Sequence, residues 1–145
     1  MVAVARVDGE RLARAREAAG LSQSALALMI GASSKQRIWQ WERGAEQPRP
    51  RYVPELAKAL AIAPLELLVG DQSQPTISAL RLAAGLTRDE VWQRATIAKM
   101  TYHRIDRGIG TRLPDLSIVR SLAAVLGVTE GEILAAIERA READS

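Results

Sequence analysis

Apolar residues recur three or four positions apart along most of the chain, which is the spacing of one face of an α-helix. Near the start, Leu12, Ala15 and Ala19 would share such a face, on a helix that Asp8 caps and Gly20 ends. No segment alternates between apolar and polar residues over the length of a strand between turn signals. The pattern therefore predicts an all-α fold.

Four more helices are expected before residue 70. The second and third are short, and each begins at a serine cap and ends at a glycine. Their caps, inward-facing residues and terminating glycines are, in chain order, Ser22, Leu26, Ile30 and Gly31, then Ser34, Ile38, Trp41 and Gly44. The fourth is expected to bury Val53, Leu56, Ala57 and Leu60, and the fifth to start at Pro64 and carry Leu65 and Leu68.

The same pattern occurs twice, at an offset close to 65 residues. The matching segments are 20–22 with 85–87, 41–44 with 105–108, and 56–60 with 122–126. The residues between the copies, 70–75, are mostly polar and include Gly and Pro, as linkers often do. The repeat predicts one domain at residues 1–69 and a second, more divergent domain at residues 76–145.

The second copy has clear helix-start signals. Thr87 with Glu90, and Thr129 with Glu132, have the spacing of a capping box. The last helix is expected to run over about 130–143, beyond the end of the repeat. Its far end is polar all round, so it is either a solvated helix end or a dimer contact.

The composition excludes several classes of chemistry. The chain has 145 residues, no Cys and a single His. No disulfide, thiolate metal site or Cys–His pair can form, and no glycine-rich phosphate loop follows a strand, so we expect neither enzymatic activity nor a cofactor. The net charge of +3 arises in residues 1–70, with 10 Lys and Arg against 7 Asp and Glu, whereas residues 71–145 carry 10 of each. Basic character suits a polyanionic partner.

An ordered set of residues over about 25 positions of the first copy is more specific. It consists of Gly20, Leu21, Ser22, Gln23, Leu26, Ala27, Gly31, Ser34, Lys35, Gln36 and Ile38, followed by Trp41-Glu42-Arg43-Gly44. This set resembles the phage lambda repressor-like, or Xre, family of helix-turn-helix DNA-binding proteins. The resemblance implies two tandem five-helix domains of a sequence-specific transcriptional regulator, with repression as the default, that binds an operator in double-stranded DNA.

In such proteins the third helix lies in the major groove with its N-terminal residues toward the base edges. With Ile38 and Trp41 inward, the outer face and start of this helix would present Ser34, Lys35, Gln36, Arg37 and Gln40. Lys and Arg donate hydrogen bonds to guanine, and Gln pairs with adenine. Phosphate contacts are expected from Gln23, at the start of the second helix, and from three arginines that flank the site: Arg43, Arg49 and Arg51.

The second copy presents different residues on the matching surface. These are Lys99, Met100, Thr101 and Arg104, with Arg107 in the place of Arg43 and Arg88 expected on a phosphate. The two copies should therefore read different sequences. Thr96 stands where the turn glycine would be, and Trp92 where Ala27 stands, so Trp92 is interpreted as a core or inter-domain plug.

Other conspicuous residues have structural interpretations. Trp41 is expected in the core, and Tyr102 is expected to be buried with its hydroxyl at the edge. Trp39 would either pack at the solvent edge or touch the DNA backbone, and His103 would face solvent or a phosphate. The arginines near the first helix are interpreted as a solvated face: Arg6, Arg11, Arg14 and Arg16.

Two alternatives stay open at this stage. The chain is either a DNA-binding regulator or a protein-interaction adaptor or antitoxin-type partner that uses its second domain for assembly, which Met100 beside Tyr102 favours in that copy only. On DNA it is either a monomer on an asymmetric site or a homodimer on a palindrome. We expect a cytoplasmic protein of a bacterium or phage, associated with the nucleoid through DNA, with no membrane contact and no small-molecule effector.

Overall fold

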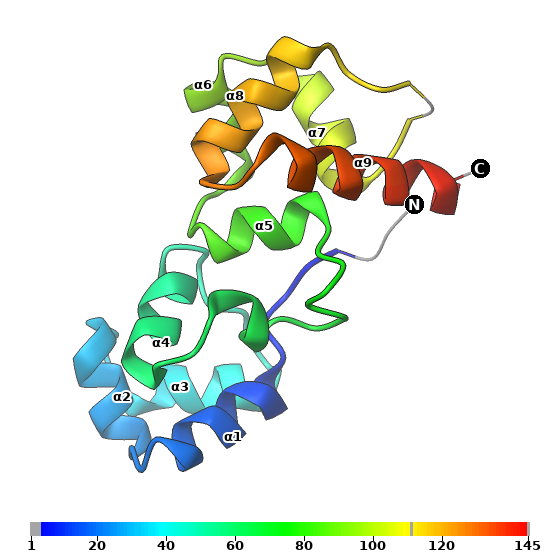
Figure 1. Ribbon diagram of the computed structural model, residues 1–145. Helices are drawn as coiled ribbons and strands as arrows, with labels where there is room; N and C mark the ends of the chain where they lie inside the picture. Colours follow the sequence, from blue (N-terminus) through cyan, green and yellow to red (C-terminus); the bar gives the residue numbers. More distant parts are fainter. Residues whose placement is uncertain (1–3, 111, 145) are drawn as a thin grey trace.

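The computed structural model describes residues 4–110 and 112–144, and these residues form an all-helical fold (Figure 1). The elements are α1 (Gly9–Ala18), α2 (Gln23–Ile30), α3 (Lys35–Glu42), α4 (Tyr52–Leu60), the short 3₁₀ helix η1 (Pro64–Leu67), α5 (Ile77–Ala83), α6 (Arg88–Ala95), α7 (Lys99–Arg107), α8 (Leu116–Leu126) and α9 (Glu130–Asp144). The predicted all-α class is confirmed. We call residues 4–69 the N-terminal unit and residues 76–144 the C-terminal unit.

Local signals place the first helices of the N-terminal unit. The Asp8 side chain accepts hydrogen bonds from two backbone N–H groups at the start of α1, and the Ser22 hydroxyl accepts one at the start of α2. Gly31 ends α2 in the left-handed conformation, with a φ of 73°. Leu12 is buried as predicted, whereas Ala19 is exposed because it already lies in the turn that follows α1.

The core of the N-terminal unit forms where α1, α2, α3 and α4 meet. The predicted inward residues of α2, α3 and α4 are buried: Leu26, Ile30, Ile38, Trp41, Val53, Leu56, Ala57 and Leu60. Trp41 and Tyr52 fill one corner of this core, with ring centroids 5.3 Å apart. Because Trp41 lies on α3 and Tyr52 on α4, this contact fixes α3 against α4.

The fifth α-helix predicted from Pro64 is wrong, because the chain makes only the single 3₁₀ turn of η1 there. After this turn the chain extends and pairs with the residues before α1. Leu68 forms an antiparallel bridge with Val7, and the N–H of Asp8 donates to the carbonyl of Leu67 at 2.8 Å. This backbone pairing competes with helix formation, and the apolar pattern alone does not reveal it.

The C-terminal unit contains α6, α7, α8 and α9 with a core of its own. The predicted capping box of Thr87 and Glu90 is present at α6. The Thr129 hydroxyl accepts a hydrogen bond from the N–H of Glu132 at the start of α9. This last helix ends at Asp144, close to the predicted end.

Helix α5 lies between the two units, as Figure 1 shows, and every residue over 77–82 is buried. Ala79 and Leu82 belong to the core of the N-terminal unit, whereas Ile77 and Leu80 belong to that of the C-terminal unit. The two units therefore share a helix, although sequence reasoning assigned it to the second domain alone. Whether residues 1–69 and 76–145 are separate domains stays a prediction.

Further contacts hold the two units together. The N–H of Ala5 donates to Ser78 Oγ at 3.3 Å. The Arg139 guanidinium donates to the carbonyl of Pro75 at 2.6 Å, which ties α9 to the linker. A methyl group at Gly85, just after α5, would lie 2.8 Å from Pro54 Cγ of α4. Close packing at this junction restricts movement of one unit against the other.

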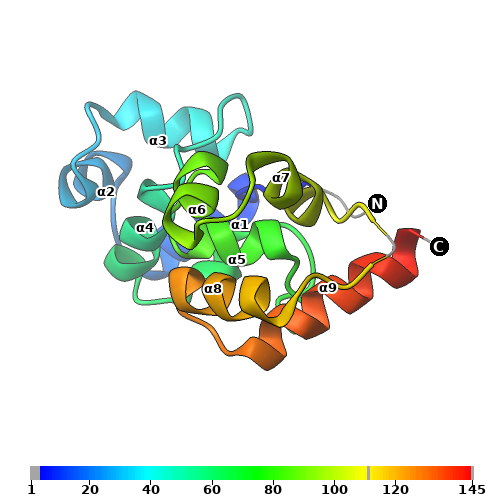
Figure 2. The same cartoon turned by 90° about the horizontal axis from the view of Figure 1, so that it is seen from above.

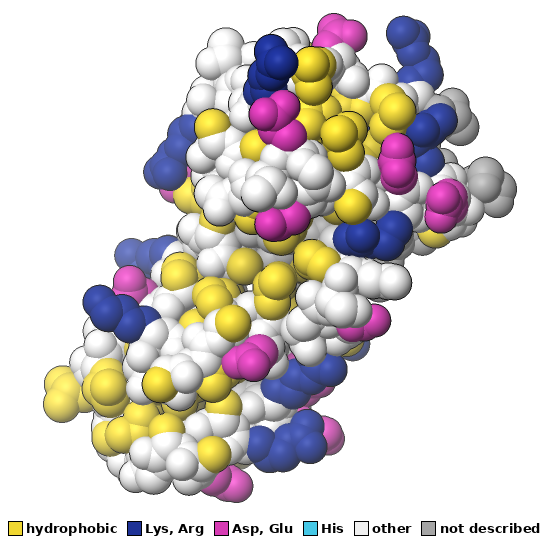
Figure 3. Space-filling model, viewed as in Figure 1, with side chains coloured by type: hydrophobic (Ala, Val, Ile, Leu, Met, Phe, Trp, Pro, Cys, Tyr) yellow, Lys and Arg dark blue, Asp and Glu magenta, His cyan; other side chains and the backbone are white. Residues whose placement is uncertain are grey.

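Helices α3 and α7 both lie on the side that faces away from the viewer in Figure 1, which is the upper edge in Figure 2. The opposite side, shown in Figure 3, carries acidic and basic side chains interspersed over both units. Among the described residues, no helix is long and apolar enough to cross a membrane.

Candidate nucleic-acid interface

Helix α3 presents a polar face because its apolar residues are anchored from below. Ile38 and Trp41 are 0% and 1% exposed. Lys35 and Gln36, on the first turn of the helix, are exposed to solvent. The start of α3 at Ser34 was predicted, but its side chain makes no capping hydrogen bond, so the expectation that it caps the helix is wrong. The backbone N–H groups of the first turn are left for water or a ligand.

Gln40 and Arg37 lie at the edge of this face and are half-buried. The Arg37 guanidinium carbon lies 5.9 Å from the centre of the Trp41 ring, a cation–π distance. Its Nε is buried and has no hydrogen-bond partner within the described residues. Arg37 is thus held by packing, with its terminal nitrogens at the rim of the α3 face.

Arg43 and Trp39 form the flank of the α3 face. Both side chains are exposed, and the Arg43 guanidinium lies 4.3 Å from the Trp39 ring centre. Trp39 lies at the solvent edge, 45% exposed, and its alternative contact with the DNA backbone stays a prediction. Stacking on the ring limits the rotamers of Arg43, which lowers the entropic cost of contacting a phosphate. Arg49 and Arg51 are exposed on the loop that follows.

A polar cluster ties α1, α2 and α3 together beneath this face. Glu42 at the end of α3 accepts hydrogen bonds from Arg16 Nε at 2.6 Å and from Gln23 Nε2 at 3.0 Å. Arg16 also donates to the carbonyl of Leu21. The hydrogen bond to Glu42 raises the pKa of Arg16 above its usual value. The prediction that Arg16 belongs to a solvated face is therefore wrong, since its side chain is only 14% exposed.

Gln23 was predicted to contact a phosphate from the start of α2. Its amide nitrogen donates to Glu42, which fixes the side chain at the N-terminus of that helix. Free backbone N–H groups at such a terminus attract anions. The structure thus places Gln23 at the expected end of the helix, and the phosphate contact itself stays a prediction.

The C-terminal unit has a matching cluster that is more deeply buried. Asp106 accepts hydrogen bonds from Arg81 Nε at 2.7 Å, Arg88 Nε at 2.8 Å and the Tyr102 hydroxyl at 2.8 Å. Arg81 also donates to the carbonyl of Leu86. These residues stand 64 or 65 positions after Arg16, Gln23 and Glu42 and repeat their contacts.

The cluster changes the titration of two of its members. Burial alone would raise the pKa of Asp106, but the hydrogen bonds and charge of Arg81, with the bonds from Arg88 and Tyr102, lower it overall. Burial, followed by the negative charge of Asp106, raises the pKa of Tyr102. The Tyr102 hydroxyl lies inside the core, so its predicted position at the edge is wrong.

Arg88 was predicted to hold a phosphate. The structure instead pairs its Nε with Asp106, although the side chain remains 39% exposed. Sequence reasoning missed Arg81 and Asp106 altogether. A signal was present, because an acidic residue ends the third helix of both copies and an arginine lies at the matching position of both first helices.

The outer face of α7 carries both polar residues and one large apolar residue. Lys99, Thr101, Arg104 and Arg107 are exposed, and Met100 is 67% exposed. Thr96 replaces the turn glycine in the left-handed conformation, with a φ of 56°. Trp92 is half-buried, with its ring nitrogen donating to Asp89, and it packs against the core of its own unit rather than between the units.

His103 lies beside α6 at the junction of the two units. It borders a hollow of about 360 Å³, together with Pro50 and Arg88. The side chain is half-buried, and its Nε2 has no hydrogen-bond partner within the described residues. Its expected solvent or phosphate role stays a prediction.

Comparison with known proteins found similarity over the segment that carries the first of these surfaces. Residues 12–67, which include α2 and α3, match the family model described as Helix-turn-helix. Repressor protein C2 of Salmonella phage P22 is 39% identical over 70 residues, which are 48% of this chain and 32% of that protein. The match thus spans about a third of the length of this relative. The comparison with solved structures found no match.

Proposed function

We propose that the chain is a transcriptional regulator that binds specific sequences of double-stranded DNA and represses, with α3 in the major groove. The observation that carries this proposal is the exposed first turn of α3 within the helix-turn-helix segment. Lys35 and Gln36 are exposed there, whereas the apolar side of the helix is fixed in the core. A relative named as a repressor supports the direction of regulation.

The residue types on this face suit direct reading of base edges. Lys35 and Arg37 donate hydrogen bonds of the kind that guanine accepts, and the Gln36 and Gln40 amides can pair with adenine. Arg43, oriented by Trp39, contacts the phosphate backbone and supplies affinity without sequence preference.

We further propose that the C-terminal unit is a second, divergent copy of the same domain, joined by residues 70–75. The repeated contacts of the Glu42 and Asp106 clusters support this relationship. Helices α3 and α7 lie on the same side of the molecule, which lets one chain place both on one duplex (Figures 1 and 2). A monomer then binds an asymmetric site, with Met100 and Thr101 suited to a thymine methyl group.

The test is selection from a random pool of duplex DNA with the full chain. Truncation at residue 70 is a poor test, because α5 contributes to the core of the N-terminal unit. Two matched double variants replace it: Lys35→Ala with Gln36→Ala, and Lys99→Ala with Met100→Ala. Lys58→Ala, at an exposed position of α4, is the control.

We expect the unmodified chain and the control to recover one bipartite motif, and each double variant to lose a different part of it. Failure of the unmodified chain to enrich any sequence overturns the proposal, as does a complete motif from the α3 variant. If only the α7 variant keeps the complete motif, the C-terminal unit does not read bases. Sedimentation with and without the selected site tests the monomer, since a dimer in both states supports a homodimer on a palindrome.

A specific observation favours the second candidate function, a protein-interaction adaptor. Met100 is 67% exposed on the first turn of α7, and an exposed apolar side chain can equally contact a protein partner. We assign the chain no catalytic activity and no cofactor, and we place its action on DNA in the cytoplasm of a bacterium or a phage-infected cell.

A further inference from the structure

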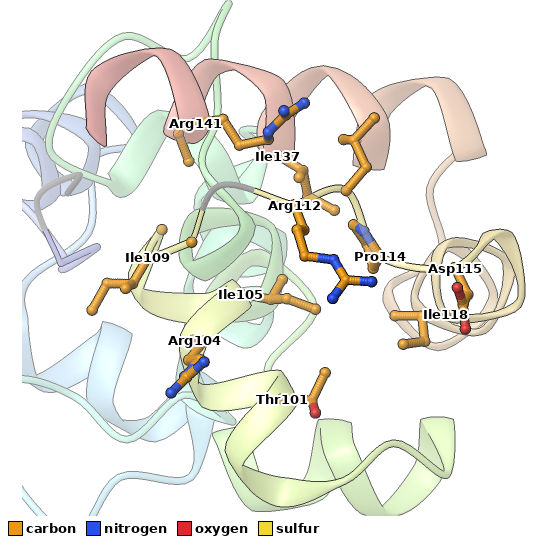
Figure 4. A pocket seen from close by; sticks show the side chains of 14 residues that line it. Thr101, Arg104, Ile105, Ile109, Arg112, Pro114, Asp115, Ile118, Ile137 and Arg141 are labelled. Carbon is orange, nitrogen blue, oxygen red and sulfur yellow. The ribbon is translucent and has the colours of Figure 1, made fainter. Parts of the chain in front are cut away.

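A groove of about 510 Å³ opens on the surface of the C-terminal unit. It lies between α7, residues 108–110 and 112–115, the first turn of α8, and α9 (Figure 4). Ile105, Ile118 and Ile137 give it an apolar lining. Arg104 and Arg112 are exposed at its border, and Arg112 extends into the space between Ile105 and Pro114 in Figure 4.

The matching corner of the N-terminal unit is filled. Trp41 precedes Glu42 there as Ile105 precedes Asp106, and Tyr52 precedes the buried Val53 as Ile118 precedes the buried Val119. The two aromatic rings pack together at 5.3 Å and are almost fully buried. In the C-terminal unit both positions hold the smaller isoleucine, and both isoleucines are only partly buried. The groove thus lies beside the positions that two packed aromatic side chains occupy in the other unit.

Arginines accompany the rings in the filled corner. The guanidinium of Arg37 lies 5.9 Å from the Trp41 ring centre, and that of Arg51 lies 4.8 Å from the Tyr52 ring centre. The C-terminal unit has arginines around the same corner but no ring for them to pack on. An incoming aromatic side chain would restore both the apolar contact and the cation–π contact.

We propose that this groove binds a partner protein through an aromatic side chain flanked by acidic residues. The isoleucines take the ring, and Arg104 and Arg112 pair with carboxylates on either side of it, because guanidinium groups bind carboxylates in two-pronged hydrogen bonds. Aromatic anchors in pockets ringed by polar contacts are the usual centres of protein interfaces. The proposal goes beyond DNA binding and does not depend on it.

The groove and the α7 face share two residues, Thr101 and Arg104, which were predicted to contact DNA. A partner in the groove would cover the end of that face. Binding of the partner and binding of DNA by α7 therefore exclude one another, while α3 remains free.

The test uses the full chain without DNA and a synthetic peptide, acetyl-Glu-Glu-Trp-Glu-Glu-amide, followed by amide chemical shifts in NMR. The comparison peptides replace the tryptophan by glycine, or the glutamates by lysines. We expect saturable shifts confined to the residues around the groove with the first peptide only. No shifts at millimolar peptide overturn the proposal, and equal shifts with the glycine peptide reduce it to attraction between charges, which also overturns it.

Two variants locate the site. Ile105→Trp fills the groove as Trp41 fills the other unit, and it should weaken binding about tenfold or more, as loss of a central interface contact does. Arg112→Glu, at an exposed position that leaves the core intact, should abolish the preference for the acidic peptide. Arg120→Ala is the matched control, because Arg120 is 65% exposed on α8 and does not line the groove.

Unchanged binding in both Ile105→Trp and Arg112→Glu overturns the proposal, since the peptide then binds elsewhere. The random-DNA selection with the same proteins gives an independent reading. If the protein binds DNA but not the peptide, only the groove proposal is overturned. If the protein binds the peptide but no DNA, the regulator proposal is overturned and the groove proposal is supported.

Discussion

The two units use the same device to hold their third helix and differ in how much charge they bury in it. In the N-terminal unit, Glu42 accepts from one arginine and one glutamine, and its side chain is 9% exposed. In the C-terminal unit, Asp106 accepts from two arginines and a tyrosine, and its side chain is 1% exposed. Asp106 is thus shorter than Glu42, lies deeper in its core, and has two positively charged partners instead of one.

The two units also differ in the corner beside this helix. The N-terminal unit keeps its corner filled with aromatic rings and has a polar α3 face above it. The C-terminal unit has Ile105 and Ile118 in place of those rings. The Asp106 cluster holds its α7, and a groove lies beside that helix. Removing the acid should therefore harm the C-terminal unit more than the N-terminal one.

The largest expected effect is on Asp106. In Asp106→Ala the buried Arg81 loses its counter-ion, and breaking a buried ion pair in this way costs about 3–5 kcal/mol of the free energy of unfolding. Glu42→Ala, the matched change, leaves only the more exposed Arg16 and should cost about 1–3 kcal/mol, as an unmade hydrogen bond does. Urea unfolding followed by circular dichroism measures both.

A larger loss in Glu42→Ala than in Asp106→Ala would contradict this comparison. Arg94→Ala controls for loss of an exposed ion pair, because Arg94 is 59% exposed and pairs with Glu90 on the same helix. Its free energy of unfolding should change by less than about 0.5 kcal/mol.

The junction between the units gives the second comparison. Gly20 and Gly85 follow the first helix of each copy with φ angles of 71° and 77°. Alanine at either position carries the penalty of the left-handed conformation, about 1–2 kcal/mol. Only at Gly85 would the added methyl group also meet Pro54, which should cost about 1–3 kcal/mol more.

The difference between Gly85→Ala and Gly20→Ala in urea unfolding thus reports the contact between the units. Equal losses would mean that the junction yields without cost. The units would then move independently, and a fixed spacing between α3 and α7 would lose its support.

These positions also show what the sequence can and cannot predict. The caps at Asp8 and Ser22 and the buried Ile38 and Trp41 follow from signals within a few residues, so they were predicted. The sharing of α5 between two cores and the pairing of Arg81 with Asp106 depend on residues far apart in the chain. The spacing of apolar residues predicts a helix but not the core in which the helix packs. It also does not predict the residue with which an arginine will pair.

The candidate nucleic-acid interface could likewise be predicted only in part. The outward face of α3 follows from its buried stripe, so the placement of Lys35 and Gln36 could be predicted before the structure. The inward turn of Arg88 could not, because it depends on where the end of α7 lies in space. The groove could not be predicted, since the sequence shows that Ile105 is smaller than Trp41 but not whether another side chain fills the space beside it.

Base reading gives the third comparison. Gln36→Ala should weaken binding to the selected site by about 1–3 kcal/mol and relax the preference at one base pair. Met100→Ala on α7 removes only an apolar contact and should cost less. Fluorescence anisotropy with single-base variants of the selected site measures both changes. If the full preference survives in Gln36→Ala, α3 is not the reading helix.

Acid unfolding tests the charge of Asp106. Because the pKa of Asp106 is lowered in the folded state, its contribution to stability is complete above its unfolded pKa of about 4 and is lost as the pH falls through the folded value. Asp106→Ala should therefore unfold with a shallower pH dependence below about pH 4. The change is at most one proton, or about 1.4 kcal/mol per pH unit. An unchanged slope in this variant would show that Asp106 does not titrate with unfolding.

The smallest expected effect is on the salt dependence of DNA binding, which distinguishes phosphate contacts made by the two units. Arg43 lies on Trp39 beside the α3 face, and Arg107 occupies the matching position on α7. Each phosphate contact contributes about 0.9 to the slope of log affinity against log salt. Arg43→Ala should flatten the slope by about that amount and weaken all sequences alike. Arg107→Ala should do the same only if α7 also lies on DNA. An unchanged slope in Arg107→Ala, beside a flatter one in Arg43→Ala, would therefore leave α3 as the DNA-binding helix and free the α7 side for the partner in the groove.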